Sequence, residues 1–532
     1  MSLTLSEEAG RRRTFAIISH PDAGKTTLTE NLLLAGGAIR AAGEVAARGE
    51  RRRTTSDWMK IERDRGISVS ASVMTFEFQG NVYNLLDTPG HEDFSEDTYR
   101  TLTAADCAIM VLDAAKGIEP QTLKLFEVCR MRDIPIVTFI NKMDREALDP
   151  LELLDQIQDQ LQLDTAPLYW PAASGQRFGG IKDLRTGEFL HYSKRTATEG
   201  LTPGVSARVD LETVRETVDP SALEELDEGS EMAVEMLPKI DRQAFLEGHM
   251  TPIVFGTALR HFGVGELLDT LEEFAPPPRP QACEKKGEPH TMERDDKGVA
   301  GFVFKIQANM DPNHRDRVAF LRLVSGEFKR GMRLKTTEGK QLNIHNPMMF
   351  LAQDREIAET AYAGDVIGVP NHGQLRVGDS LSDGGDIKFA GIPNFAPEIL
   401  RRARPKDPMK AKHLRKALES LSEEGVTQLF VPSIGSDMIV GAVGALQIEV
   451  MAERMVTEYN LDVVFETAPY NVARWIGGDE DKVKAFMEKN KSSSGTDLDG
   501  APVYLAKNAW DVGYAQEKNP DLRFTATKER MI

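Results

Sequence analysis

The chain has 532 residues, of which 41% are hydrophobic, so it can bury several cores, and its length predicts three or four domains. A formal net charge of −18 argues against a surface built as a whole for nucleic acid, and three widely spaced cysteines argue against a disulfide scaffold or a cysteine metal site. Without an apolar run fit for a signal peptide or a membrane span, the sequence predicts a soluble, cytoplasmic protein with no membrane partner and reduced thiols.

The segment from Thr14 to Leu34, TFAIISHPDAGKTTLTENLLL, has the pattern of a strand, a tight polar loop and a helix. Its loop matches the phosphate-loop motif G-x-x-x-x-G-K-[S/T], except that a serine stands at the first glycine position. Gly24 lets backbone N–H groups face phosphate oxygens, Lys25 supplies a point charge, and Thr26 offers a hydroxyl to Mg²⁺. The expected nucleotide contacts here are Ser19, His20, Pro21, Asp22, Ala23, Gly24, Lys25, Thr26 and Thr27.

A second polar segment, DTPGH, follows the apolar strand that ends at Asp87. An acidic side chain at a strand end can hold Mg²⁺, and a Pro-Gly turn can sense a third phosphate with a backbone N–H and move when that phosphate leaves. Taken alone, the tetrapeptide DTPG is more typical of a plain β-turn. Its position after a strand adds Asp87, Thr88, Pro89, Gly90 and His91 to the predicted site.

A third segment, NKMD, ends the buried-type strand Ile136–Ile140. Open α/β sheets bind ligands at the carboxyl ends of their strands. The Asp144 carboxylate can accept hydrogen bonds from both N1–H and the exocyclic amine of guanine, whereas adenine offers no such pair of donors. The expected contacts are Asn141, Lys142, Met143 and Asp144, and the predicted ligand is GTP or GDP.

In chain order, the pattern predicts a multidomain protein. An α/β domain over residues 1–278 has a doubly wound sheet, and a subdomain over 165–250 interrupts it, with a hairpin across Arg185-Thr186-Gly187 and an acidic helix from Ser221 to Leu237. The prolines at 276–280 end a helix over Val264–Phe274 and begin a linker over 279–298. Short strands then predict an antiparallel β-barrel over 279–392, and mixed helix and strand patterns predict an α+β domain over 393–532.

The three nucleotide motifs in this order resemble the translational GTPase family, which includes elongation factors G and Tu. The resemblance implies a first switch at Arg65-Gly66-Ile67-Ser68, in which Ser68 replaces a threonine that binds Mg²⁺, and a loose base-side motif at Gly256, Thr257 and Ala258. The implied metal ligands are Thr26, Ser68 and Asp87, and the implied catalytic residues are His91, which places the attacking water, and Lys25. It also implies that Pro21 forms a gate with Ile67, and that the inserted subdomain is of the elongation factor G kind.

The chain stops within about 70 residues of the stretch GAVGALQIEVMAERMVTEYNLDVV, where translocases of the family continue for two further domains. This length resembles the branch that acts in bacterial translation termination. The implied function is a ribosome-dependent GTPase that promotes dissociation and recycling of codon-reading release factors after peptide release. Its implied partners are the ribosome, with its RNA and proteins, and a release factor reached through the ribosome, and the chain is expected to be a monomer.

Two alternatives stay open at this stage. One is a translocase or ribosome-protection GTPase, and the other is a metabolic GTPase subunit such as that of sulfate activation. The basic run at 401–416 is equally typical of a solvated face and of an RNA contact.

Overall fold

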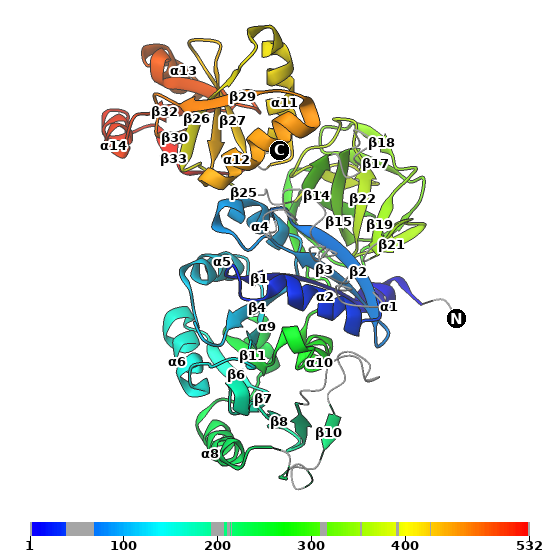
Figure 1. Cartoon of the computed structure of the whole chain (residues 1–532). Helices are drawn as coiled ribbons and strands as arrows, with labels where there is room; N and C mark the ends of the chain where they lie inside the picture. Colours follow the sequence, from blue (N-terminus) through cyan, green and yellow to red (C-terminus); the bar gives the residue numbers. More distant parts are fainter. Residues whose placement is uncertain are drawn as a thin grey trace.

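The structure is a computed structural model, and it describes residues 3–38, 69–192, 207–209, 213, 215–216, 218–308, 317–351, 354–389, 393–425 and 427–529. Figure 1 shows three parts: an α/β domain with its insertion in the lower half, a β domain beside it, and a C-terminal α+β domain at the top. This confirms the predicted fold class. The predicted first switch, Arg65 to Ser68, lies outside the described residues.

The α/β domain is built on a sheet with the strand order β2-β3-β1-β4-β5-β11-β6, in which only β2 is antiparallel to its neighbour. Apolar strands alternate with helices, and α2 packs on α10 while α5 packs on α4 and α6. The elements are α1 (Leu5–Gly10), β1 (Arg12–Ser19), α2 (Lys25–Ala35), β2 (Ser72–Phe78), β3 (Asn81–Asp87), η1 (Glu92–Phe94), α4 (Ser95–Leu102), β4 (Cys107–Asp113), α5 (Pro120–Met131), β5 (Ile136–Asn141), α6 (Pro150–Leu161), β6 (Asp164–Pro167), β11 (Met250–Phe255) and α10 (Val264–Phe274).

The insertion forms a separate antiparallel sheet in the order β10-β9-β8-β7, covered by a long helix. Its elements are β7 (Tyr169–Ala172), β8 (Gly180–Asp183), β9 (Phe189–His191), β10 (Ala207–Val209), α8 (Pro220–Met236) and α9 (Arg242–Leu246). The hairpin between β8 and β9 turns at Arg185-Thr186-Gly187, as predicted. Strand β6, although it falls in the range predicted as inserted, pairs with β11 in the main sheet.

The β domain is a half-barrel with the strand order β18-β17-β23-β14-β15-β22-β19, and it adjoins the α/β sheet through one parallel pairing of β19 with β2. Its strands are β14 (Ala300–Ala308), β15 (Arg317–Ser325), β16 (Glu327–Lys329), β17 (Arg333–Thr336), β18 (Gln341–Asn343), β19 (Met348–Leu351), β20 (Asp354–Ile357), β21 (Thr360–Tyr362), β22 (Val366–Pro370), β23 (Ser380–Ser382) and β24 (Ile387–Phe389).

The prediction of a linker over 279–298 was wrong. Strands β12 (Gln281–Lys285) and β13 (Glu288–Met292) form a hairpin that pairs with β24. Lys286 and Gly287, with φ of 55° and 82°, make the two-residue turn that suits a twisted hairpin. Only Cys283 and Met292 in this hairpin are buried, so its polar composition hid the strand pattern.

Buried ion pairs join the α/β domain to the β domain. The Arg322 guanidinium lies 2.5 Å from the Asp106 carboxylate, and the Arg12 guanidinium lies 3.3 Å from Asp365. The Thr14 hydroxyl also donates to the Gly364 carbonyl at 2.7 Å. Because removal of either partner leaves a buried charge, such pairs specify how the two domains fit together.

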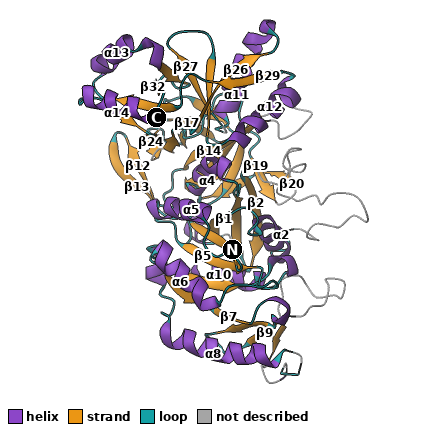
Figure 2. Cartoon of the chain, turned by 60° about the vertical axis from the view of Figure 1, so that its left-hand side comes forward, coloured by secondary structure: helices purple, strands orange, loops and turns teal. Residues whose placement is uncertain are grey.

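The C-terminal domain has an eight-stranded antiparallel sheet, in the order β29-β26-β28-β27-β31-β32-β30-β33, with helices packed on it (Figure 2). The predicted apolar stripes are largely core: Leu414, Ala417, Leu418 and Leu421 of α11 are buried, as are Met451 and Met455 of α12. The elements are β25 (Pro393–Phe395), β26 (Ile399–Pro405), α11 (Ala411–Glu423), β27 (Gln428–Pro432), β28 (Met438–Ala442), α12 (Ala445–Tyr459), β29 (Val463–Thr467), β30 (Val472–Gly477), α13 (Glu480–Lys489), β31 (Ser494–Asp497), β32 (Pro502–Ala506), α14 (Ala509–Lys518), β33 (Arg523–Thr525) and β34 (Thr527–Glu529).

Within the described part of the chain, no helix has both the length and the apolar character needed to cross a bilayer.

Candidate functional site

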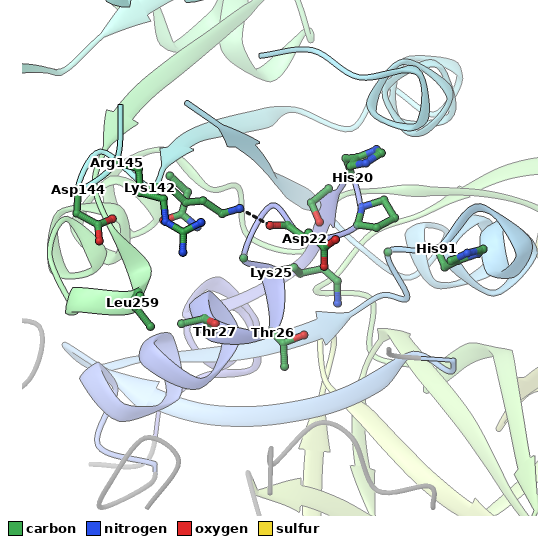
Figure 3. Close-up of a pocket in the computed structure, with 15 residues that line it drawn as sticks. His20, Asp22, Lys25, Thr26, Thr27, His91, Lys142, Asp144, Arg145 and Leu259 are labelled. Atoms are coloured by element: carbon green, nitrogen blue, oxygen red, sulfur yellow. Dashed lines mark hydrogen bonds between the residues drawn. The ribbon is translucent and has the colours of Figure 1, made fainter. Parts of the chain in front are cut away.

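A cleft of about 340 Å³ opens at the carboxyl ends of β1, β3 and β5, and the three sequence motifs meet there (Figure 3). Most of the predicted residues line it: Ser19, His20, Pro21, Asp22, Gly24, Lys25, Thr26, Thr27, Gly90, His91, Asn141, Lys142 and Asp144. Most of the other predicted residues, Ala23, Asp87, Thr88, Pro89, Met143, Thr257 and Ala258, are buried, and Asp87 and Thr257 contact the lining residues Lys25 and Asp144. Ser68 lies outside the described residues. Residues of all three motifs thus line one continuous cleft.

The phosphate loop has the backbone of an anion cradle. Ser19 is the last residue of β1, so the position where the motif has its first glycine is extended and needs no glycine here. Left-handed backbone occurs instead at Asp22, with φ of 66°, and at Gly24, with φ of 95°. Helix α2 begins at Lys25 and directs its free N–H groups at the cleft.

Lys25 and Asp87 form an ion pair of 2.7 Å between the Nζ and Oδ1 atoms, and both side chains are almost fully buried. Asp87 ends β3, and the Thr88 hydroxyl behind it donates to the Ile17 carbonyl at 2.6 Å, which fixes the start of the DTPGH turn against β1. A lysine held by a carboxylate at this point can exchange that partner for a phosphate oxygen.

The Asn141 side chain connects its own loop with the loops that contain Ala23 and Ala258. Its side chain is 2% exposed, its Nδ2 donates to the Ala23 carbonyl at 2.8 Å, and its Oδ1 accepts from the Ala258 N–H at 2.8 Å. A Cβ on Gly24 would come within 2.3 Å of the same Nδ2, so the close approach of the phosphate loop requires glycine. The NKMD motif therefore also positions the loop of the first motif.

Lys142 and Asp144 line the end of the cleft next to the Gly256-Thr257-Ala258 segment. The Lys142 Nζ donates to the Asp22 carbonyl at 2.5 Å (Figure 3). The same Nζ pairs with Asp113 Oδ2 at 2.7 Å. Asp144 Oδ1 accepts from the Thr257 hydroxyl at 2.7 Å, which brings the Gly256-Thr257-Ala258 segment to this end of the cleft. The Asp144 carboxylate thus keeps a second oxygen toward the cleft, with the Arg260 guanidinium 3.8 Å away.

His91 borders the opposite end of the cleft, and its ring points away from Lys25 toward η1 (Figure 3). Its Nδ1 accepts from the Asp93 N–H at 3.2 Å, and its side chain is 35% exposed. A neutral imidazole bound in this way carries its proton on Nε2. The structure therefore holds the His91 ring turned away from Lys25.

Family models match most of the chain. The model for the elongation factor Tu GTP binding domain matches residues 10–277, which is half of the chain. The chain belongs to the translational GTPases. The model for elongation factor G domain 2 matches residues 298–384 of this translational GTPase, and that for the C-terminal domain of class II release factor RF3 matches residues 389–516. It is therefore a translational GTPase of the release factor 3 type.

A crystal structure of a protein from Thermus thermophilus is similar to this translational GTPase. The two have 25% sequence identity and a TM-score of 0.68, over 91% of this chain and 72% of that chain. The similarity therefore extends over the whole arrangement of domains and is not limited to the GTP-binding sheet.

Some residues that line or support the cleft of this translational GTPase were not predicted from the sequence. Arg145 and Leu259 line the cleft, and each follows directly after a predicted motif. Asp113 forms an ion pair with Lys142. It could have been predicted as a site residue, because it stands at the end of an apolar strand. Glu119, 3.1 Å from the His20 Nε2, precedes a helix and had no such signal.

Proposed function

We propose that the cleft binds GTP with Mg²⁺ and that the residues of the three motifs divide the ligand among them. The α2 N-terminus, Gly24 and Lys25 hold the phosphates, and Asp144 reads guanine. The Thr26 hydroxyl and the Asp87 carboxylate are oxygen donors of the kind that Mg²⁺ prefers, so the residues present fit this ion, which would neutralise phosphate charge. Ser68, the third predicted ligand, lies outside the described residues and stays a prediction.

Hydrolysis would depend on two side chains. Lys25 leaves Asp87 to stabilise negative charge on the phosphates, and His91 turns to orient the attacking water. Because the His91 ring points away from Lys25, we expect slow turnover by the protein alone and strong stimulation by a partner that reorients the ring.

For the cellular role, we propose a ribosome-dependent GTPase that promotes dissociation and recycling of codon-reading release factors after peptide release. The match of the C-terminal domain to that of class II release factor RF3 carries this proposal. The implied partners are the ribosome and, through it, the release factor, and we propose that the chain acts as a cytoplasmic monomer. The units that move would be residues 1–278, 279–392 and 393–532.

Contacts of α4 support such a movement, because this helix directly follows the phosphate-sensing turn and touches both other domains. Toward the β domain, the Asp97 carboxylate lies 3.4 Å from the Lys305 Nζ, and the same carboxylate accepts from the Ala71 N–H of the α/β domain at 2.6 Å. Toward the C-terminal domain, Glu96 accepts from Gln428 at 2.8 Å, and the buried Arg100 donates to the Gly425 carbonyl. A change at Gly90 can therefore be transmitted to both domains.

The test uses ribosomes stalled after peptide release that carry a fluorescent codon-reading release factor. Adding this protein with GTP should speed dissociation of the release factor, whereas GDP or no nucleotide should have little effect. An unchanged dissociation rate, together with advance of messenger RNA by one codon on elongating ribosomes, would instead establish a translocase.

A further inference from the structure

The turn that carries His91 is attached to the C-terminal domain by an unusual helix cap. Helix α12 begins after Gly444, which has no side chain to accept a hydrogen bond from the free N–H groups of the first turn. The carboxylate of Asp93, 353 residues away in the chain, accepts instead from the Leu446 N–H at 2.7 Å. Leu446 is the second residue of the helix, so Asp93 acts as an N-cap side chain supplied by another domain.

The Asp93 carboxylate and a side chain at position 444 cannot occupy the same space. A Cβ built on Gly444 would lie 1.9 Å from the Asp93 Cγ, so the Asp93 carboxylate occupies the place of a side chain at position 444. Gly444 has φ of −140° and ψ of 171°, an extended conformation open to any residue. A side chain at 444 is therefore prevented by Asp93 and not by backbone strain.

An apolar contact surrounds the cap. Phe94, next to Asp93, packs with Val450 and Leu446 of α12 and with Val69, at the start of the described segment that follows the first-switch motif. Phe94 and Val450 are almost fully buried. The η1 turn is thus held by both a charged hydrogen bond and a hydrophobic contact, so α12 and η1 shift together.

The same residue holds His91. The Asp93 N–H donates to His91 Nδ1 at 3.2 Å, and the Asp93 Oδ1 lies 3.7 Å from that nitrogen. We propose that Asp93 is a positioning residue through which the docked C-terminal domain keeps the His91 ring turned away from the nucleotide. Movement of α12 would free Asp93 and η1, and His91 could then turn into the cleft. The inference rests on the proposed catalytic role of His91.

Gly444→Ser tests this without uncapping α12. The serine hydroxyl supplies a local N-cap, and its Cβ displaces Asp93. We expect ribosome-independent hydrolysis in single turnover to rise about threefold or more, while the GTP dissociation constant stays within twofold. The reason is that η1, whose Asp93 N–H holds His91 Nδ1, is then attached to α12 by the apolar contact alone, so the His91 ring can turn more readily. The ratio of ribosome-stimulated to basal rate should fall by the same factor. Gly513→Ser, in an open position on α14 of the same domain, should change none of these quantities.

Two further variants keep the result decisive. If Gly444→Ser folds poorly, Asp93→Ala serves as the second variant, and it should also raise the basal rate of hydrolysis. Combining His91→Ala with Gly444→Ser should abolish the increase in basal rate. A basal rate unchanged or lowered in well-folded Gly444→Ser and Asp93→Ala overturns the inference. If His91→Ala alone leaves ribosome-stimulated turnover unchanged, the catalytic assignment of His91 fails, which is a separate result.

Discussion

Asn141→Ala removes the side chain that connects the phosphate loop to the base-side loop, and we expect it to weaken nucleotide binding more than it weakens the fold. The substitution leaves the Ala23 carbonyl and the Ala258 N–H without their partner, each now at 2.8 Å from Asn141. An unpaired buried group costs about 1 to 3 kcal/mol, so the two together cost about 2 to 6 kcal/mol at most.

Both groups belong to loops that border the cleft, so part of this loss is relieved when the loops move and take up water. The nucleotide must then restore the loop positions when it binds. If about half of the loss appears in binding, roughly 1 to 3 kcal/mol, the GTP dissociation constant rises about 5- to 150-fold.

The assay is an equilibrium titration with a fluorescent GTP analogue, accompanied by thermal unfolding. Asn371→Ala is the matched control, because Asn371 is as buried as Asn141 and likewise organises a loop, but in the β domain. The control should lose stability and keep its affinity for GTP. If Asn141→Ala binds GTP within twofold of the parent, the loops are positioned by other contacts, such as that of Lys142 with Asp22.

Further predictions concern the reaction, the base, the domain interface and one thiol. His91→Ala should keep GTP affinity and lower ribosome-stimulated turnover on the order of 10²-fold, and equal turnover would exclude His91 from the mechanism. Asp144→Asn should lose GTP and gain xanthosine triphosphate in a competition assay, because an amide can donate to the extra oxygen of xanthine, and retained preference for GTP would mean that guanine is read elsewhere. Asp106→Ala should lower the free energy of unfolding by about 3 to 5 kcal/mol in denaturant titration, since it leaves the buried Arg322 charge unpaired, and a loss below about 1 kcal/mol would contradict this. Burial raises the pKa of the Cys107 thiol to about 12, so at pH 8 the thiol stays protonated, and mass spectrometry should find its alkylation at least about 10²-fold slower in the native protein than after unfolding.

The sequence alone predicted that the three motifs meet in one cleft, because each motif is short and follows an apolar strand. A parallel sheet brings the carboxyl ends of its strands to one edge, so Lys25, Gly90 and Asp144 meet once the strand order is right. The apolar helical stripes of the C-terminal domain, such as Leu414 to Leu421, were predictable for a similar reason. Their 3.6-residue spacing is visible within one short segment of the sequence.

What the sequence could not determine depends on contacts between distant segments. The hairpin of β12 and β13 buries only two of its side chains, so no alternation was visible, and it is stabilised by pairing with β24 about a hundred residues later. Nothing near Gly444 predicts that Asp93 caps its helix, and nothing near Asn141 predicts that it binds Ala23 and Ala258. Local patterns determine which elements form and which face is apolar, whereas a hydrogen bond between domains depends on positions to within a fraction of an ångström that only the packed tertiary structure fixes.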